Sequence, residues 1–265
     1  MSAAVPYWRE AGIGPAVVCL HSNASASGQW RSLMDRLSDR YHVLAADSYG
    51  AGRSPEWSSS RTITLSDEVD LLAPVLERAG ARFSIVGHSY GAAIALKVAL
   101  LRPDRVTSIA VYEPTLFSLI DAESPEPNDA DGIREAVAQA AAALDLSDRE
   151  TAARVFIDYW MGPASWSRIP EERKAAIAAS VVSVRRWAHA LFKEPAPIAA
   201  FANLDVPTLY MTGARTTTSA QGVARRLLAA LPRAKHVEFP SLGHMGPITH
   251  PDVVNSAIEE FIRAH

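Results

Sequence analysis

Residues 83–91 read FSIVGHSYG, and this stretch decides the fold class. Phe83–Val86 is a short apolar run, which is typical of a strand covered on both faces. The motif GHSYG follows it directly, and helical spacing then continues to Leu101. G-x-S-x-G between a strand and a helix is the pattern of a nucleophile elbow, a strained turn that exposes a serine hydroxyl above a sheet. The pattern predicts Ser89 as a nucleophile; the alternative is an ordinary serine in a glycine-bordered turn.

Strand and helix patterns alternate on both sides of this motif. Further strands are predicted at Ala16–Leu20, Val43–Ala46, Val106–Tyr112, Thr208–Thr212 and His236–Phe239, and helices at Gln29–Leu37, Leu65–Ala79 and Val253–Arg263. Strands that alternate with helices in this way indicate an α/β fold with a mainly parallel sheet flanked by helices.

The pattern is interrupted between the predicted strands Val106–Tyr112 and Thr208–Thr212. Residues 121–130 read DAESPEPNDA, a polar, proline-containing stretch that we expect to be an exposed connection. Alanine-rich helical segments follow it at about 131–145, 148–160 and 171–192, and Glu194–Pro197 ends them. We therefore predict a helical lid at 116–200, inserted into a core formed by 1–115 and 201–265.

Composition excludes several classes of protein. The 265 residues are 48% hydrophobic, enough to bury a substantial core. The 26 Lys and Arg nearly balance 29 Asp and Glu, which argues against nucleic acid as the main partner. The single cysteine, Cys19, excludes an intramolecular disulfide and any metal site built from several cysteines. No apolar stretch suits export or a bilayer span, so we expect a cytoplasmic protein without a membrane partner.

A candidate general base lies near the other end of the chain. Residues 243–247 read GHMGP and follow the last predicted strand. A histidine between glycines on such a loop is well placed to take a proton. A serine hydroxyl needs a neighbouring base to become nucleophilic, so we assign that role to His244. The alternative is a histidine on a surface loop.

A third motif supplies candidate hydrogen-bond donors. Residues 20–25 read LHSNAS and follow the strand Ala16–Leu20. A backbone N–H from this loop, most simply that of Asn23, can combine with the N–H of Tyr90 to form an oxyanion hole. The alternative is a polar turn whose small residues only permit tight packing.

Together these motifs resemble the α/β-hydrolase fold superfamily over nearly the whole chain. The resemblance is carried by LHSNAS (20–25), DSYGAGRS (47–54), GHSYG (87–91), LRPDRV (101–106) and PSLGHMGPITHP (240–251). It implies a serine hydrolase that works through an acyl-enzyme, with no metal and no organic cofactor.

The sequence departs from this family at the acid of the triad. Most relatives carry it in a G-x-x-D turn after the penultimate strand, but that turn here reads GARTTT (213–218). Thr216 stands at the expected position, and we expect its replacement to cost little. Some members of the family place the acid after the strand that follows the elbow helix, and Glu113, directly after Val106–Tyr112, can still reach the histidine. Glu113 is therefore the best substitute, and Pro114 is expected to hold it in an extended conformation. The alternative is that Glu113 caps a helix or pairs with an arginine, leaving a Ser–His dyad.

The resemblance implies a small carboxylic ester, or a related carbonyl compound, as substrate. Two rivals remain open: a carbon–carbon bond hydrolase of ring-cleavage diketones, and a small-ligand receptor with little turnover. The receptor hypothesis remains open because no carboxylate follows the penultimate strand. Aromatic residues are frequent in the predicted lid, and Trp160, Trp166 and Trp187 are expected to line the substrate pocket.

Overall fold

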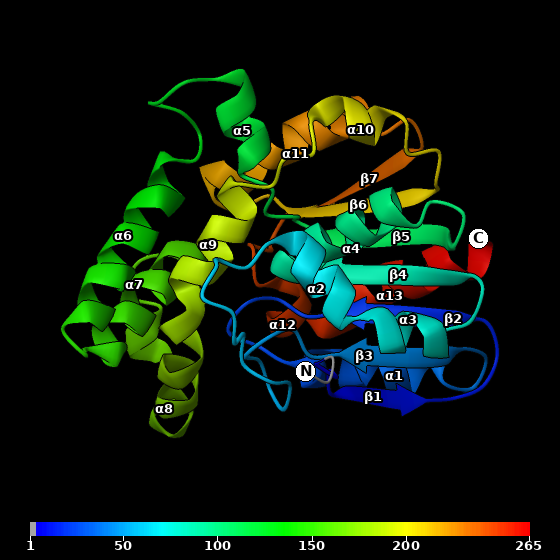
Figure 1. Ribbon diagram of the computed structural model, residues 1–265, viewed down its shortest axis with the longest axis horizontal. Helices are drawn as coiled ribbons and strands as arrows, with labels where there is room; N and C mark the ends of the chain where they lie inside the picture. Colours follow the sequence, from blue (N-terminus) through cyan, green and yellow to red (C-terminus); the bar gives the residue numbers. More distant parts are fainter. Residues whose placement is uncertain (1–3) are drawn as a thin grey trace.

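The structure is a computed structural model that describes residues 4–265. Within those residues, seven strands form one sheet in the order β1-β3-β2-β4-β5-β6-β7 (Figure 1). The strands are β1 (Trp8–Ala11), β2 (Ala16–Leu20), β3 (His42–Ala46), β4 (Phe83–His88), β5 (Val106–Tyr112), β6 (Thr208–Gly213) and β7 (Ala234–Phe239). Only β1 runs antiparallel to its neighbour, and the remaining pairs are parallel. The predicted mainly parallel sheet is confirmed.

Helices connect these strands, and those nearest the sheet pack on both of its faces. They are η1 (Ser27–Trp30), α1 (Arg31–Leu37), α2 (Leu65–Leu71), α3 (Ala73–Arg78), α4 (Tyr90–Leu101), α5 (Ser118–Glu123), α6 (Asp131–Asp145), α7 (Arg149–Met161), η2 (Trp166–Arg168), α8 (Glu171–Ser180), η3 (Val181–Ser183), α9 (Val184–Phe192), α10 (Ile198–Ala202), α11 (Thr218–Ala230), α12 (Gly246–Thr249) and α13 (Pro251–Ala264). None of the helices within residues 4–265 has the length and apolar character needed to cross a membrane.

Alternation of side chains along the strands divides the core into two layers. On β2, Val18 and Leu20 belong to a buried cluster that also contains residues of α2, α3, α4 and α11. Val17 and Cys19 point to the opposite face and pack with residues of α1 and α13. All five residues of β2 are buried. This two-sided burial explains why the strands read as continuous apolar runs.

Several elements differ from the prediction. The helical segment predicted over 171–192 is divided into α8, η3 and α9. The segment predicted as one helix over 65–79 is two helices, with α2 ending at Leu71 and α3 beginning at Ala73. Pro74 causes the break, because it has no N–H to donate to the preceding turn. Strand β1 was not predicted, since its sequence WREA carries two charges and no apolar run.

The segment between β5 and β6 is helical and lies at one end of the sheet, where α6–α9 form a separate layer (Figure 1). Several polar contacts fasten it to the sheet domain, and two of them involve largely buried side chains. Lys97 of α4 pairs with the buried Glu194, which follows α9, at 2.7 Å. The Tyr159 hydroxyl of α7 lies 2.6 Å from Ser219 Oγ of α11. The inserted helices are therefore held against both halves of the core.

Candidate active site

Ser89 stands on a strained turn between β4 and α4. Its backbone has φ 57° and ψ −116°, a conformation that costs a non-glycine residue about 1–3 kcal/mol. Both glycines of the motif are required by close approach. A Cβ on Gly87 would lie 2.6 Å from the Ala92 Cα, and one on Gly91 would lie 2.3 Å from the Leu20 carbonyl oxygen. Gly91 therefore allows the loop after β2 to lie against the start of α4.

The parallel register brings three further segments to the same edge of the sheet as Ser89. His88 is paired with Tyr112, and Tyr112 with Met211, so Glu113 emerges between the ends of β4 and β6. The loop after β7 supplies His244. Residues that are far apart in the sequence thus meet where parallel strands end, which is where α/β folds build their sites.

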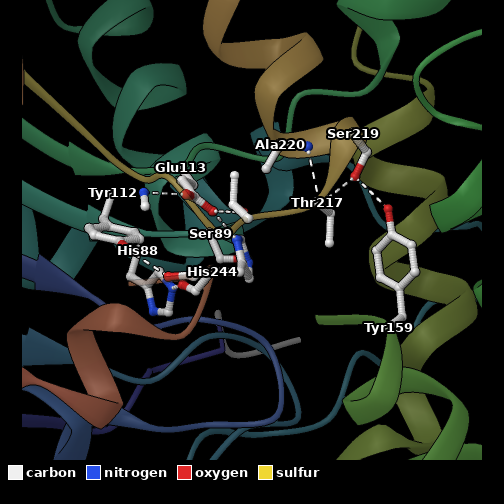
Figure 2. Close-up of polar contacts among 12 residues, drawn as sticks. His88, Ser89, Tyr112, Glu113, Tyr159, Thr217, Ser219, Ala220 and His244 are labelled. Atoms are coloured by element: carbon white, nitrogen blue, oxygen red, sulfur yellow. Dashed lines mark hydrogen bonds and ion pairs between the residues drawn. The ribbon is translucent and has the colours of Figure 1, made fainter. Parts of the chain in front are cut away.

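His244 links Ser89 and Glu113 (Figure 2). Its Nε2 lies 2.8 Å from Ser89 Oγ, and its Nδ1 lies 2.6 Å from Glu113 Oε2. These contacts assign the Nδ1–H tautomer, which donates to the carboxylate and leaves Nε2 free to accept from the hydroxyl. Ser89 is 5% exposed, His244 1% and Glu113 0%. A buried serine, histidine and carboxylate in this order can generate an alkoxide nucleophile and stabilise the resulting imidazolium.

Glu113 makes contacts that differ in part from those expected. It neither caps a helix nor pairs with an arginine: Oε1 accepts from the Gly213 N–H at 2.8 Å, and Oε2 accepts from Thr216 Oγ1 at 2.6 Å. Its φ is +45°, so the extended conformation expected before Pro114 is wrong. The hydrogen bonds to the carboxylate compensate for a strained backbone. Thr216, which we expected to be unimportant, contacts the carboxylate directly.

His88 supports the loop that carries His244. Its Nε2–H donates to the His244 carbonyl oxygen at 2.8 Å, and its Nδ1 accepts from Gln29 Nε2 at 3.1 Å. Burial, together with the neighbouring His244, lowers the pKa of His88 well below its ordinary value. His88 is therefore neutral and holds backbone in place. Gln29 Oε1 in turn accepts from the Ser22 N–H at 3.1 Å, which ties the loop after β2 into the same network.

Asp47 and His21 have structural roles near this loop. Asp47 is buried and accepts from the N–H groups of Ser27, at 2.5 Å, and Arg53, at 2.9 Å. His21 accepts from the Ser48 N–H at 3.1 Å, and burial lowers the pKa of its ring. Both side chains join the loop after β3 to the segment after β2. Neither lines the cavities beside Ser89 described below.

Two backbone N–H groups are candidates for an oxyanion hole: that of Tyr90, which follows Ser89 in the chain, and that of Asn23, which lines a cavity with it. Tyr90 is the first residue of α4, so its N–H has no acceptor within the helix. Asn23 lines a cavity together with Ser89, and no protein acceptor within residues 4–265 receives its N–H. The contact of Gly91 with the loop after β2 brings these segments together. Such donors can stabilise a negatively charged oxygen.

Two cavities adjoin Ser89. The larger has a volume of about 760 Å³ and also contains His244, with Phe156, Ile157 and Trp160 of α7 in its wall. The smaller, of about 20 Å³, is lined by Ser89, Thr115 and mainly apolar side chains that include Trp187. Each cavity is thus formed jointly by the sheet domain and the inserted helices.

The three tryptophans expected in the pocket have different positions. Trp160 borders both cavities and its ring stacks on that of His244, with centroids 3.8 Å apart and planes inclined by 24°. Trp187 borders the smaller cavity. Trp166 lines neither: it belongs to η2, after the end of α7, and its buried ring has Lys174 Nζ 5.7 Å from its centroid. Its predicted place in the pocket is wrong. Helical spacing could not reveal the stacking on His244, which depends on the tertiary fold.

No three His, Cys, Asp or Glu side chains come together in a metal-binding arrangement anywhere in the described range 4–265. The chemistry that the site itself offers is that of Ser89, His244 and Glu113, together with the two N–H donors.

Known proteins resemble this chain along nearly its full length. A family model described as alpha/beta hydrolase fold matches residues 15–251. A Klebsiella pneumoniae protein that bears the name of a carbamate hydrolase is 27% identical over 94% of this chain and 92% of its own. The pimeloyl-[acyl-carrier protein] methyl ester esterase of Nitrosomonas europaea is 26% identical over 91% of this chain and 93% of its own.

A solved structure shows the same fold. MGS-M2, an alpha/beta hydrolase enzyme from a Medee basin deep-sea metagenome library, superimposes with a TM-score of 0.79 at 20% identity, over 97% of this chain and 94% of its own.

Proposed function

The chain belongs to the alpha/beta hydrolase fold family and is a hydrolase, and from this premise we propose that it cleaves small carboxylic esters through an acyl-enzyme on Ser89. One observation carries the proposal: Ser89 Oγ, the His244 ring and the Glu113 carboxylate are joined by contacts of 2.8 and 2.6 Å. The matched N. europaea relative, named as a methyl ester esterase, supports an ester as substrate.

The first half of the reaction acylates the enzyme. His244 Nε2 takes the proton of Ser89 Oγ as the oxygen attacks the ester carbonyl carbon. The carbonyl oxygen becomes an oxyanion, which the N–H groups of Asn23 and Tyr90 stabilise. His244 then gives its proton to the departing alkoxide, and the alcohol leaves.

The second half releases the acid. Water enters, His244 takes one of its protons, and the oxygen attacks the acyl carbon. The tetrahedral intermediate collapses, Ser89 leaves as the alkoxide and recovers a proton from His244, and the carboxylic acid departs. Glu113 fixes the Nδ1–H tautomer and stabilises the imidazolium in both halves of the reaction.

Glu113 is the feature that favours an enzyme with a complete triad over a dyad or a receptor. The receptor hypothesis depended on the missing carboxylate after β6, and Glu113 provides one from β5. A buried carboxylate that is bonded to Gly213, Thr216 and His244 at once has the geometry of an orienting group.

We assign the role of lid to residues 116–200, over a core of 1–115 and 201–265. The assignment is supported by α7, whose Phe156 and Trp160 line the larger cavity, and by Trp187 of α9 in the smaller one. Apolar side chains over a reacting serine limit the access of water to it.

Covalent labelling and turnover test the proposal together. The wild-type protein should react stoichiometrically with a fluorophosphonate at Ser89 and hydrolyse p-nitrophenyl acetate. Ser89→Ala should lose labelling, and its turnover should fall on the order of 10⁴- to 10⁶-fold with an unchanged melting temperature. A ring-cleavage diketone assayed in parallel measures carbon–carbon bond cleavage. Near wild-type ester hydrolysis by Ser89→Ala would overturn the proposal.

A further inference from the structure

The larger cavity beside Ser89 has an unbalanced charge. Its wall includes two arginines, Arg31 and Arg173, and no aspartate or glutamate. Arg31 is the first residue of α1, in the sheet domain, whereas Arg173 belongs to α8, in the inserted helices. The two cations therefore come from the two parts of the protein that enclose the cavity.

Neighbouring cations are neutralised, but these two are not. On α1, Arg36 pairs with Asp252 and Glu259, and on α8, Lys174 pairs with Glu171. Within the described residues 4–265, no carboxylate lies within 4.0 Å of either Arg31 or Arg173, and the side chain of neither donates a hydrogen bond to a protein acceptor.

The position of Arg31 gives a second indication. It starts a helix whose first turn contains no acidic residue. An unpaired guanidinium has five N–H donors in a fork that matches a carboxylate.

The smaller cavity limits the size of one of the two substituents on the scissile carbonyl. Its volume of about 20 Å³ is only slightly more than one water molecule needs. Apolar rings such as those of Phe117 and Trp187 form its walls. Both cavities contain Ser89 and Asn23, so the scissile carbonyl lies where they meet. One substituent of that carbonyl is therefore small and apolar, and the other extends into the larger cavity toward the arginines.

We propose that the substrate is an anion: a compound with a small apolar group on one side of the scissile carbonyl and, on the longer arm, a carboxylate bound by Arg31 and Arg173. This inference rests on the proposed function, because it takes Ser89 as the point of attack. It narrows the substrate class from esters in general to carboxylate-bearing ones.

Matched pairs of esters test the inference. One pair is 4-acetoxybenzoate and its neutral methyl ester, which place the charge on the leaving group. The other is monomethyl glutarate and methyl pentanoate, which place it on the acyl group and leave a methoxy group as the small substituent. The variants are Arg31→Gln and Arg173→Gln. Arg149→Gln is the control, because Arg149 is an exposed arginine of the inserted helices that lies outside the cavity wall.

In at least one pair, each cavity variant should lower kcat/KM for the anionic ester by about tenfold, mainly through KM, and leave the neutral ester unchanged. Higher ionic strength should weaken the preference of the wild type for the anion in the same way. Arg149→Gln should behave as wild type. Equal effects on anionic and neutral esters in both pairs would overturn the inference and leave the proposed function intact.

A binding measurement keeps the two proposals separable. Calorimetric titration of Ser89→Ala with glutarate and with 4-hydroxybenzoate requires no turnover. At least one of these anions should bind to Ser89→Ala, and about tenfold more weakly to the double variant Ser89→Ala/Arg173→Gln. That result supports the anion site even if the esters prove to be poor substrates. If neither anion binds, the anion site is wrong, whatever the outcome for Ser89.

Discussion

The hydroxyl of Thr216 donates a hydrogen bond of 2.6 Å to Glu113 Oε2, the same carboxylate oxygen that faces His244 Nδ1. Thr216 occupies the position where most relatives carry the acid itself. Here the acid comes from the end of β5, and the turn after β6 provides the group that orients it. Thr216 therefore does not replace the acid but binds the carboxylate of Glu113, which does.

Thr216 should consequently matter for turnover. Thr216→Val keeps the shape of the side chain but removes the donor, and a hydrogen bond to a charged group contributes about 1.5–3 kcal/mol. We expect kcat for p-nitrophenyl acetate to fall roughly 10- to 100-fold with little change in KM. Thr216→Ser, which keeps the hydroxyl, should retain most of the activity.

A double-mutant cycle identifies the route of this effect. Glu113→Gln should lower kcat by roughly 10⁴, as loss of the carboxylate does in a serine protease. In that background Thr216→Val should add little, because its partner is no longer a charge. Independent, additive losses would show that Thr216 does not act through Glu113.

The stacking of Trp160 on His244 leads to a prediction about the base. The ring holds one face of the imidazole, and an aromatic pair of this kind contributes about 0.5–1.5 kcal/mol. Trp160→Leu should lower kcat by up to about tenfold for every ester, whereas Trp160→Phe should stay near wild type. Trp166→Leu is the control, since Trp166 lies outside both cavities; it should lower the melting temperature without this loss of kcat.

Trp187 should instead control acyl length. It borders the small cavity beside Ser89, and its truncation enlarges that space. Each additional buried methylene is worth about 0.8 kcal/mol, so Trp187→Ala should raise the ratio of kcat/KM for p-nitrophenyl butyrate to that for the acetate by roughly tenfold. An unchanged ratio would mean that the acyl group lies in the larger cavity.

Glu68 predicts how stability depends on pH. It is buried beneath the elbow and accepts hydrogen bonds from the Tyr90 hydroxyl and the Tyr49 N–H, and burial raises its pKa to about 7 from 4.5. Because the folded state holds this proton more tightly, the contribution of Glu68 is greatest below pH 4.5 and declines until pH 7. The change amounts to about 3 kcal/mol, from about 1.4 kcal/mol for each pH unit.

Glu68→Gln removes this titration. Urea unfolding at pH 5 and pH 8 should show that the free energy of unfolding of the variant gains on that of the wild type as the pH rises. The Gln side chain can still accept from the Tyr49 N–H and donate to the Tyr90 hydroxyl. A difference between the two proteins that does not change with pH would show that Glu68 does not titrate in this range.

The sheet and the motif residues could be predicted because their signals are local. A strand buried on both faces reads as an apolar run, and the elbow needs its glycines wherever it occurs. Glu113 could be found as well, because the turn at 213–218 offers no acid and some members of the α/β-hydrolase family place it after the strand that follows the elbow helix. Its contact with His244 was expected on those grounds, and the structure places the two groups 2.6 Å apart.

Other features could not be predicted because they depend on tertiary contacts. The edge strand β1 has no apolar pattern of its own, and its pairing with β3 defines it. Trp160 meets His244 only because α7 crosses the end of the sheet. Arg31 and Arg173 are ordinary surface arginines in the sequence, and only the fold places both in one cavity without a carboxylate.

Trapping the acyl-enzyme tests the central claim most directly. The protein is mixed with p-nitrophenyl acetate, quenched in acid during turnover, digested and analysed by peptide mass spectrometry. The account predicts an acetyl group on the peptide that contains Ser89. This adduct should be absent from Ser89→Ala, which should also have lost turnover. An acetyl group on another residue, together with hydrolysis that persists in Ser89→Ala, would contradict it.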